Sequence, residues 1–333
     1  MQDQLDELVR NYFEDAVYEI ASVPFGLTNV TKIVKMNEKR YVLRMYNRYM
    51  KHIRGIALEA RITSFLTQSY LSFQVPVFQQ TLTGNDFVQL SDGTLGAIIS
   101  FLEGDNHELI SLQDAAEIGR VVGEITYALS QFDIGQMDYL GISFLDMYKL
   151  HPLASRGAVA AFIESPPFHI PETSLCFYKE TVQLVEKNVH LLKKLPEQLV
   201  HHDLLIFNLL SQNKRICGVL DFDFVSLDIS FMEFAICLNH LLQMTNGSME
   251  MMEAFVKSYS GYRKHNLQEL EQLQTLTQIY HLAVLHFYIG QHHGGDDIQQ
   301  NFNYILNQLL TRDAWLVKHN KDVQQMLMTY LID

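Results

Sequence analysis

The pattern of apolar residues changes near Gly104 and divides the chain into two parts that should fold differently. Before Gly104, short runs of β-branched and aromatic residues alternate with turn residues, which predicts strands. After it, apolar residues mostly recur at helical spacing. We therefore expect an α+β fold with a small antiparallel β-sheet lobe containing one internal helix (1–102) and a larger, mainly helical lobe (103–333). Because no Pro-, Gly- or Ser-rich linker separates them, the two lobes should pack around one cleft.

Local signals place the main elements of each lobe. An apolar stripe from Leu5 to Val17 predicts an N-terminal helix. The first lobe should continue with a β-hairpin (28–46), a helix (53–69) and three short strands (75–104). In the second lobe, Ser111 and Asp114 form a capping box that opens a helix to about residue 131. Further predictions are a helix (173–195), a strand (199–202), a hairpin with its turn at 212–214, and helices to the end.

Charge and composition exclude several classes of protein. The formal net charge of −13 argues against a nucleic-acid surface, which needs clustered Lys and Arg. No apolar run reaches the ~18 residues of a membrane span, and the acidic N-terminus is unlike a targeting peptide. The 3 cysteines lack CxxC spacing and, being odd in number, cannot form a complete set of disulfides, so we expect a reducing, cytoplasmic location. We expect no nucleic-acid or membrane partner, while the sequence does not indicate an oligomeric state.

The segment LVHHDLLIFNLL (199–210) places polar residues in an otherwise apolar stretch. Burying an unpaired carboxylate there would cost several kcal/mol or more, so Asp203 needs a reason to be present. His201-x-Asp203-Leu204-x-x-x-Asn208 has the spacing of a kinase-like catalytic loop, and Asp221-Phe222-Asp223 follows after a hairpin, where such enzymes have D-F-G. Either Asp203 or Asn208 alone is more often a turn cap or a backbone partner. The whole set, in this order, favours phosphoryl transfer.

Each polar residue of this set then has an expected role. Asp203 would accept the proton of the hydroxyl group that is phosphorylated, and Asn208 and Asp221 would hold Mg²⁺ through hard oxygen ligands. Asp223 and His201 are possible auxiliary residues.

The first lobe offers candidates for nucleotide binding. Arg44, on the second strand of the predicted hairpin, could donate to phosphate oxygens, and Glu59 on the next helix could hold it. Thr28 and Asn29 lie in FGLTNVT, the turn that would cover the phosphates, although it has only one glycine. The backbone of Phe101, Leu102 and Glu103, where strands give way to helices, could contact adenine. Each charged residue alone would be read as a solvated surface charge.

Together these motifs resemble the aminoglycoside phosphotransferase, choline kinase and homoserine kinase superfamily of small-molecule kinases. The matching segments are FGLTNVT, YVLRMYN, SFLEG, HHDLLIFN and GVLDFDFVSLDISFMEFA, which span residues 25–235 in family order. GLTN with YVLR is similar to choline kinases, and GVLDFDF with FMEFAICLN to the homoserine kinase branch, which has an acid near Glu233. The resemblance implies a bilobal kinase-like fold, ATP with Mg²⁺, and a small alcohol as phosphate acceptor. It also implies Asp203 as base and Asn208 and Asp221 as metal ligands.

Several points remain open from the sequence. The family commonly has H-G-D-x-H-P-x-N, whereas this chain has His202, Leu205 and Ile206 at the variable positions. The acceptor could be homoserine, choline or ethanolamine, an aminoglycoside or a sugar; for an amine, Asp296 and Asp297 are candidate binding residues. A different class, a nucleotide-binding pseudokinase or interaction protein without turnover, is favoured by Leu205 and the single glycine but opposed by the complete Asp–Asn–Asp set.

Overall fold

The computed structural model describes residues 2–14, 17–22, 29–36, 38–49, 51–135 and 137–332. The chain forms two compact units whose segments are interleaved along the sequence. The first unit contains 1–106, 132–140 and 208–223, and the second contains 107–131, 141–207 and 224–333.

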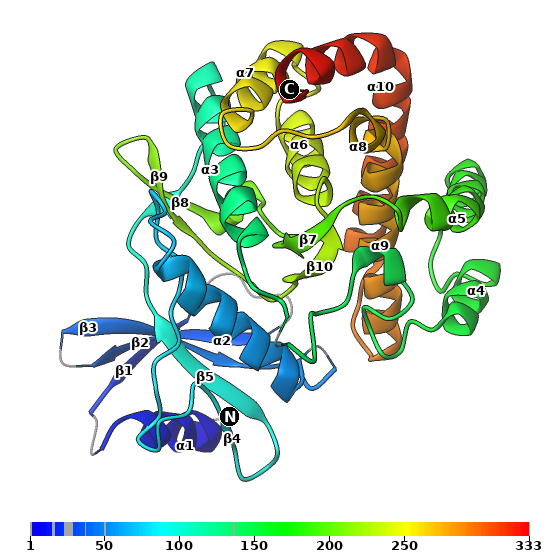
Figure 1. Cartoon of the computed structure of the whole chain (residues 1–333). Coiled ribbons are helices and arrows are strands. Elements are labelled where there is room, and N and C mark those ends of the chain that lie inside the picture. Colours follow the sequence, from blue (N-terminus) through cyan, green and yellow to red (C-terminus); the bar gives the residue numbers. More distant parts are fainter. Residues whose placement is uncertain are drawn as a thin grey trace. The chain divides into compact units, whose positions relative to one another are not determined.

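The first unit is built on a five-stranded antiparallel sheet in the order β1-β2-β3-β5-β4 (Figure 1). Its strands are β1 (Glu19–Ser22), β2 (Val30–Met36), β3 (Lys39–Met45), β4 (Val88–Gln89) and β5 (Leu95–Ser100). Successive strand residues point to opposite faces, so each face packs on a different helix. Leu43 and Ile98 pack with α1 (Gln2–Tyr12), whereas Ala97 and Ile99 pack with α2 (Ile53–Thr67).

A second, three-stranded sheet completes the first unit. Its strands are β6 (Asp105–Asn106), β8 (Leu209–Gln212) and β9 (Arg215–Val219), in the order β6-β8-β9. Asn213 and Lys214 form the β8–β9 turn with φ of 53° and 63°, the left-handed conformation that a tight hairpin turn requires. Backbone hydrogen bonds between Gln74 and the β9 residues Cys217 and Val219 tie this sheet to the rest of the unit.

The second unit is mainly helical. Its helices are α3 (Leu112–Ser130), α4 (Arg156–Glu164), α5 (Glu172–Leu192), α6 (Met232–Met244), α7 (Met249–Tyr259), α8 (Leu267–Leu270), α9 (Leu273–His293) and α10 (Gln299–Leu331). Short 3₁₀ turns occur at η1 (Phe144–Asp146) and at η2 (Ile206–Asn208), which ends as the chain passes into the first unit. Strands β7 (Glu197–Val200) and β10 (Ser226–Ile229) form a two-stranded antiparallel sheet. Helix α6 is apolar around most of its circumference, which explains why nearly all of it is buried.

The structure confirms the α+β class and most of the predicted elements. The β2–β3 hairpin, helix α2, the Ser111–Asp114 capping box and the β8–β9 hairpin are all present. None of the helices in the described residues combines the length and hydrophobicity that a transmembrane segment needs.

Three local predictions were wrong. The first helix ends at Tyr12 rather than near Val17, because residues 19–22 pair with β2 as strand β1. Residues 75–80 do not form a strand; only isolated bridges at Gln74 and Phe78 occur there, and Pro76 has no N–H to donate. Strand β10 was missed, since its four residues become a strand only by pairing with β7.

The predicted lobes were continuous stretches, whereas the compact units are interleaved. The reason is the β8–β9 hairpin, which pairs with β6 and bonds to Gln74 and is therefore grouped with the first unit. The assignment of a nucleotide-binding lobe and a substrate lobe stays a prediction.

Candidate active site

A buried cluster of opposite charges lies in the first unit, around Arg44 on β3. The Arg44 guanidinium Nη1 lies 3.0 Å from Glu59 Oε1, 3.0 Å from Asp223 Oδ1 and 3.7 Å from Asp221 Oδ1. Arg44 and Asp223 are 179 positions apart in sequence, and the β9 hairpin brings them together. The cluster therefore joins Arg44 and Glu59, which were predicted to bind nucleotide, with Asp221, which was predicted to bind metal.

Two further side chains complete this Arg44 cluster. Lys51 Nζ lies 3.2 Å from Glu59 Oε2 and 3.6 Å from Asp223 Oδ1, although Lys51 follows β3 in a segment where sequence gave no sign of burial. The Asn29 amide donates to the second oxygen of Asp223. Thr28, also predicted to bind nucleotide, lies outside the described residues.

The charges of the Arg44 cluster shift each other's pKa. Burial by itself would lower the pKa of Arg44 and Lys51, but the neighbouring carboxylates outweigh it and raise both. Burial would raise the pKa of Asp223, yet Arg44 and Lys51 lower it, so this carboxylate stays ionised. Burial raises the pKa of Glu59 against the pull of Lys51. Asp223 is therefore the main anionic partner of the two cations.

Asp221 combines an unusual backbone conformation with a buried carboxylate oxygen, and both bear on its predicted role as a metal ligand. It adopts φ of 63°, a left-handed conformation that costs a non-glycine residue of the order of 1 kcal/mol. Its buried Oδ1 has no hydrogen-bond partner among the described residues. Burial and the charge of Asp223 raise the pKa of Asp221. A hard divalent cation would satisfy this oxygen, so Asp221 fits the predicted Mg²⁺ role.

The other predicted metal ligand, Asn208, belongs to the same unit. Its backbone carbonyl accepts a hydrogen bond of 2.9 Å from the N–H of Leu220, the residue before Asp221. The β8–β9 hairpin thus starts directly after Asn208, and the residue that follows its second strand bonds back to Asn208. Phe101, Leu102 and Glu103 follow β5, and the Glu103 carboxylate pairs with Arg40, whose guanidinium lies 4.2 Å above the Phe101 ring. Their backbone role toward adenine stays a prediction.

The segment around Asp203 belongs to the second unit and is held by α6. Glu233 Oε2 accepts a 2.5 Å hydrogen bond from the His201 N–H, and Cys237 Sγ lies 3.4 Å from the Leu204 carbonyl oxygen. His201 Nδ1 accepts from the Asp203 N–H at 3.2 Å. The fully buried His201 therefore acts on the backbone of this loop, which supports an auxiliary, positioning role.

His202 occupies a left-handed backbone position, with φ of 68°. Its buried imidazole bonds Asp228 Oδ2 at 3.0 Å and the Phe224 carbonyl oxygen at 3.1 Å, and it stacks on Phe144 with ring centroids 4.2 Å apart. Glycine is the residue that adopts this conformation without strain. Here the side-chain contacts hold a histidine in that conformation.

The charge of Asp203 affects the pKa of two tyrosines of α9. Burial, followed by the Asp203 charge, raises the pKa of both Tyr280 and Tyr288. Tyr280 stacks in turn against Phe144, with centroids 6.3 Å apart. The aromatic side of α9 and Cys237 of α6 therefore both lie within the electrostatic influence of Asp203.

Asp296 and Asp297 are both exposed, just beyond the end of α9. Asp297 Oδ1 accepts a 3.1 Å hydrogen bond from the Gln299 N–H at the start of α10, and Asp296 acts by its charge on His151. Asp297 thus bonds to the backbone of the first residue of α10. Binding of an amine by either residue stays a prediction.

The structure thus brings together Asn29, Arg44, Glu59, Asp221 and Asp223 in one unit, with Asn208 beside them, and it places Asp203 in the other. Sequence reasoning missed Lys51 and the roles of Cys237 and Asp228. No local signal could have identified them, because each acts through burial against a distant segment. Glu233 was noticed by its position in the motif, but its bond to the His201 backbone was not foreseen.

Comparison with known proteins shows what the whole chain is similar to. A model of the phosphotransferase enzyme family matches residues 19–270. Homoserine kinase from Rhizobium meliloti (strain 1021) is 25% identical over 281 residues, covering 82% of this chain and 80% of that protein. Homoserine kinase from Paramagnetospirillum magneticum is 23% identical over 294 residues, covering 86% of this chain and 84% of that protein.

Solved structures with a similar fold include other small-molecule kinases. A microcompartment-associated aminopropanol kinase superposes with a TM-score of 0.70 at 15% identity, covering 97% of each chain. Choline kinase from Cryptosporidium parvum Iowa II gives a TM-score of 0.60 at 13% identity, covering 94% of this chain and 93% of the other. At such low identity the likeness shows a shared kinase-like fold.

Proposed function

Since the chain belongs to the phosphotransferase enzyme family and is a small-molecule kinase, we propose that it transfers the γ-phosphate of ATP to the hydroxyl group of an amino alcohol, with homoserine as the first candidate. The observation that carries the proposal is the Arg44 cluster, whose partners are those that a kinase needs around a nucleotide. The curated relatives described above are homoserine kinases. The aminopropanol and choline kinases share the fold, so other amino alcohols are the second choice.

Each residue has a proposed task. Arg44 would donate to the phosphate oxygens of ATP, while Glu59 and Asp223 orient its guanidinium. Asn208 and Asp221 would hold Mg²⁺, which neutralises phosphate charge when bound. Asp203 would orient the acceptor hydroxyl and accept its proton as the oxygen attacks phosphorus. Glu233 and His201 keep the Asp203 backbone in place, so most of the acceleration would come from positioning and electrostatics.

The lobe assignment is part of this proposal. Residues 1–102 would provide most nucleotide contacts, including Asn29 and the backbone of 101–102, with the backbone of Glu103 adjoining them. Residues 103–333 would carry the catalytic loop and the acceptor pocket. The partner is a small alcohol, and the cytoplasm, where ATP is available, is the proposed location. The similarity to kinases supports an enzyme rather than a nucleotide-binding protein without turnover.

The test is ADP release with Mg-ATP across homoserine, ethanolamine, choline, 1-amino-2-propanol, an aminoglycoside and a sugar. We expect the highest kcat/KM for homoserine. Asp203→Asn should lower kcat by about 10²–10⁴-fold, as loss of a general base does, while ATP affinity stays near the wild-type value.

Wild-type turnover by Asp203→Asn would contradict the base assignment. A faster reaction with another acceptor would replace homoserine only. Mg-ATP binding by calorimetry without ADP release from any acceptor would instead support the nucleotide-binding protein without turnover.

A further inference from the structure

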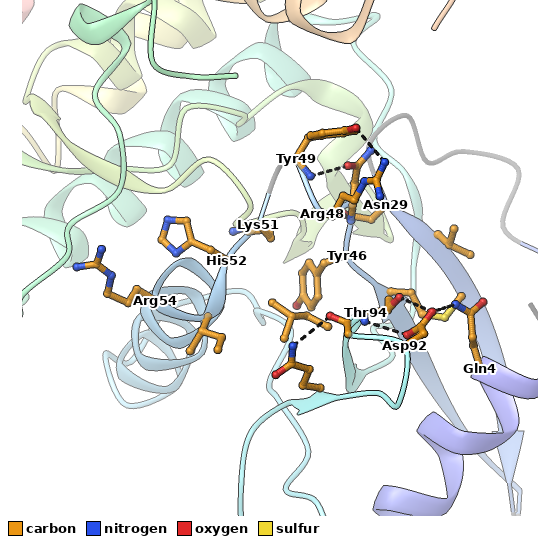
Figure 2. A pocket seen from close by; sticks show the side chains of 17 residues that line it. Gln4, Asn29, Tyr46, Arg48, Tyr49, Lys51, His52, Arg54, Asp92 and Thr94 are labelled. Carbon is orange, nitrogen blue, oxygen red and sulfur yellow. Dashed lines mark hydrogen bonds between the residues drawn. The ribbon is translucent and has the colours of Figure 1, made fainter. Parts of the chain in front are cut away.

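A groove of about 1050 Å³ lies in the first unit, where the segment after β3 meets the start of α2 and the β4–β5 turn. Figure 2 shows Lys51, His52 and Arg54 on the α2 side of this groove and Thr94, Asp92 and Gln4 on the opposite side, with Tyr46 between them. Asn29 and Lys51 of the Arg44 cluster also line this groove, whereas Arg44, Asp203 and the predicted metal ligands do not.

The groove is positively charged in a chain whose formal net charge is −13. Arg48, Lys51 and Arg54 all line it, and Asp92 is the one acidic side chain among its lining residues. Asp92 already accepts hydrogen bonds from the Gln4 amide at 2.6 Å and the Thr94 hydroxyl at 3.0 Å. The Asp92 carboxylate is therefore hydrogen-bonded to neighbours on the same side of the groove.

The two arginines of the groove differ from the arginines of this chain that form ion pairs. Arg40, Arg44, Arg120 and Arg156 each pair with a carboxylate. Across the described residues, neither Arg48 nor Arg54 forms an ion pair with one. Arg48 instead donates to the Tyr49 hydroxyl at 2.9 Å, and Arg54 lies 5.5 Å from the Tyr139 ring centroid. The aromatic rings hold these guanidinium groups while leaving donors free for an anion.

A buried polar group without a partner points to the same space. Tyr46 is only 4% exposed and lines the groove, and its hydroxyl has no hydrogen-bond partner in the described part of the chain. An unpaired buried hydroxyl costs about 1–3 kcal/mol, so such groups are rare unless a ligand or water completes them. Lys51, 9% exposed, lines the groove as well and remains protonated beside Glu59 and Asp223.

We propose that this groove is a binding site for the oxyanion group of a small polar molecule, with Arg48 and Arg54 as its charged donors and the Tyr46 hydroxyl as a neutral one. A phosphate monoester and an amino-acid carboxylate share this chemistry. The site is separate from the tasks assigned to Arg44 and Asp203, and it does not depend on the proposed reaction.

Calorimetric titration of the full-length chain, without ATP or Mg²⁺, tests the proposal with three probes. Phosphoethanolamine carries a phosphate, homoserine carries a carboxylate, and ethanolamine carries neither. We expect at least one anionic probe to bind, and Arg48→Gln and Arg54→Gln each to weaken it about tenfold or more, as loss of a charge-assisted hydrogen bond does. Tyr46→Phe should weaken it about threefold to tenfold while preserving the packing of the ring. Which probe responds identifies the oxyanion.

Arg61→Gln is the matched control, because Arg61 lies two turns further along α2, 5.9 Å from the Phe132 ring centroid, and does not line the groove. It removes the same charge and should leave the affinity unchanged. Equal affinity in Arg48→Gln, Arg54→Gln and Arg61→Gln would overturn the proposal, even if the probe binds at the acceptor site. So would the absence of binding by both anionic probes at millimolar concentration, or groove-dependent binding of ethanolamine.

Discussion

The predicted catalytic loop (201–208) contains a histidine, His202, in a backbone conformation that its residue type does not favour. His202 is left-handed at a position where the family pattern commonly has glycine, and the Asp228, Phe224 and Phe144 contacts offset that strain. Leu205, which replaces the family's usual histidine, is 8% exposed and packs as a core residue. Apolar packing and hydrogen bonds from α6 therefore hold this loop in place.

Glu233 gives this loop a predicted pH dependence of stability. Burial raises the pKa of Glu233 from 4.5 to about 7 and outweighs the opposing effects of the His202 ring, the His201 and His202 backbone and the Cys237 thiol. A raised folded-state pKa contributes stability that is complete below pH 4.5 and is lost as the pH rises through 7. Relative to Glu233→Gln, the wild type should therefore lose roughly 3 kcal/mol of unfolding free energy across this range.

Urea unfolding of both chains at intervals between about pH 5 and 8 measures this difference. The Gln variant is the appropriate control, because it keeps an oxygen acceptor for the His201 N–H and does not titrate. A wild-type-to-variant difference that is constant across the range would show that Glu233 has an ordinary pKa.

At the level of elements, helix packing depends on two glycines in α3. A Cβ atom at Gly119 would lie 2.2 Å from the Phe255 carbonyl oxygen of α7, and one at Gly123 would lie 2.9 Å from the Tyr259 carbonyl oxygen. Both distances are too short for a real contact, so α3 and α7 approach with their backbones almost touching. This explains why the helix written IGRVVGEIT keeps two glycines despite their low helix propensity.

Gly119→Ala should destabilise the chain by about 2 kcal/mol or more, because overpacking outweighs the gain in helix propensity. Gly157→Ala in α4 is the matched control, since no atom lies within 4 Å of the added Cβ. It should leave stability unchanged or raise it by up to about 1 kcal/mol. Thermal or urea unfolding followed by circular dichroism measures both; equal effects of the two substitutions would refute the close approach of α3 and α7.

At the level of the whole molecule, the two units share one interleaved chain. The chain leaves the second unit after Phe207 and enters the first at Asn208, so the predicted catalytic loop contributes residues to both. The metal-ligand candidates belong to the first unit because the β8–β9 hairpin pairs with β6 of that unit. Ligand binding at these residues would therefore stabilise a unit assembled from three separate stretches of sequence.

Mg-ADP should raise the melting temperature of the full-length chain by several degrees, because a ligand at 100 times its Kd stabilises the folded state by ~2.7 kcal/mol. Removal of Mg²⁺ with EDTA should abolish most of this shift, since the cation would no longer join the nucleotide phosphates to Asp221. Asp221→Asn should shift little with or without Mg²⁺. A wild-type shift of the same size in EDTA would argue against the proposed metal site.

The sequence by itself determined the α+β class, the main hairpins and helices, the capping box at Ser111, and the family, which the match over residues 19–270 confirms. These follow from patterns local in sequence, such as apolar periodicity, turn residues and the spacing around Asp203. Tertiary structure alone decided that Lys51 is buried beside Asp223, that Glu233 holds the His201 backbone, and that residues 19–22 become a strand. Burial, ion pairing and strand pairing join residues far apart in the chain, so no local pattern encodes them.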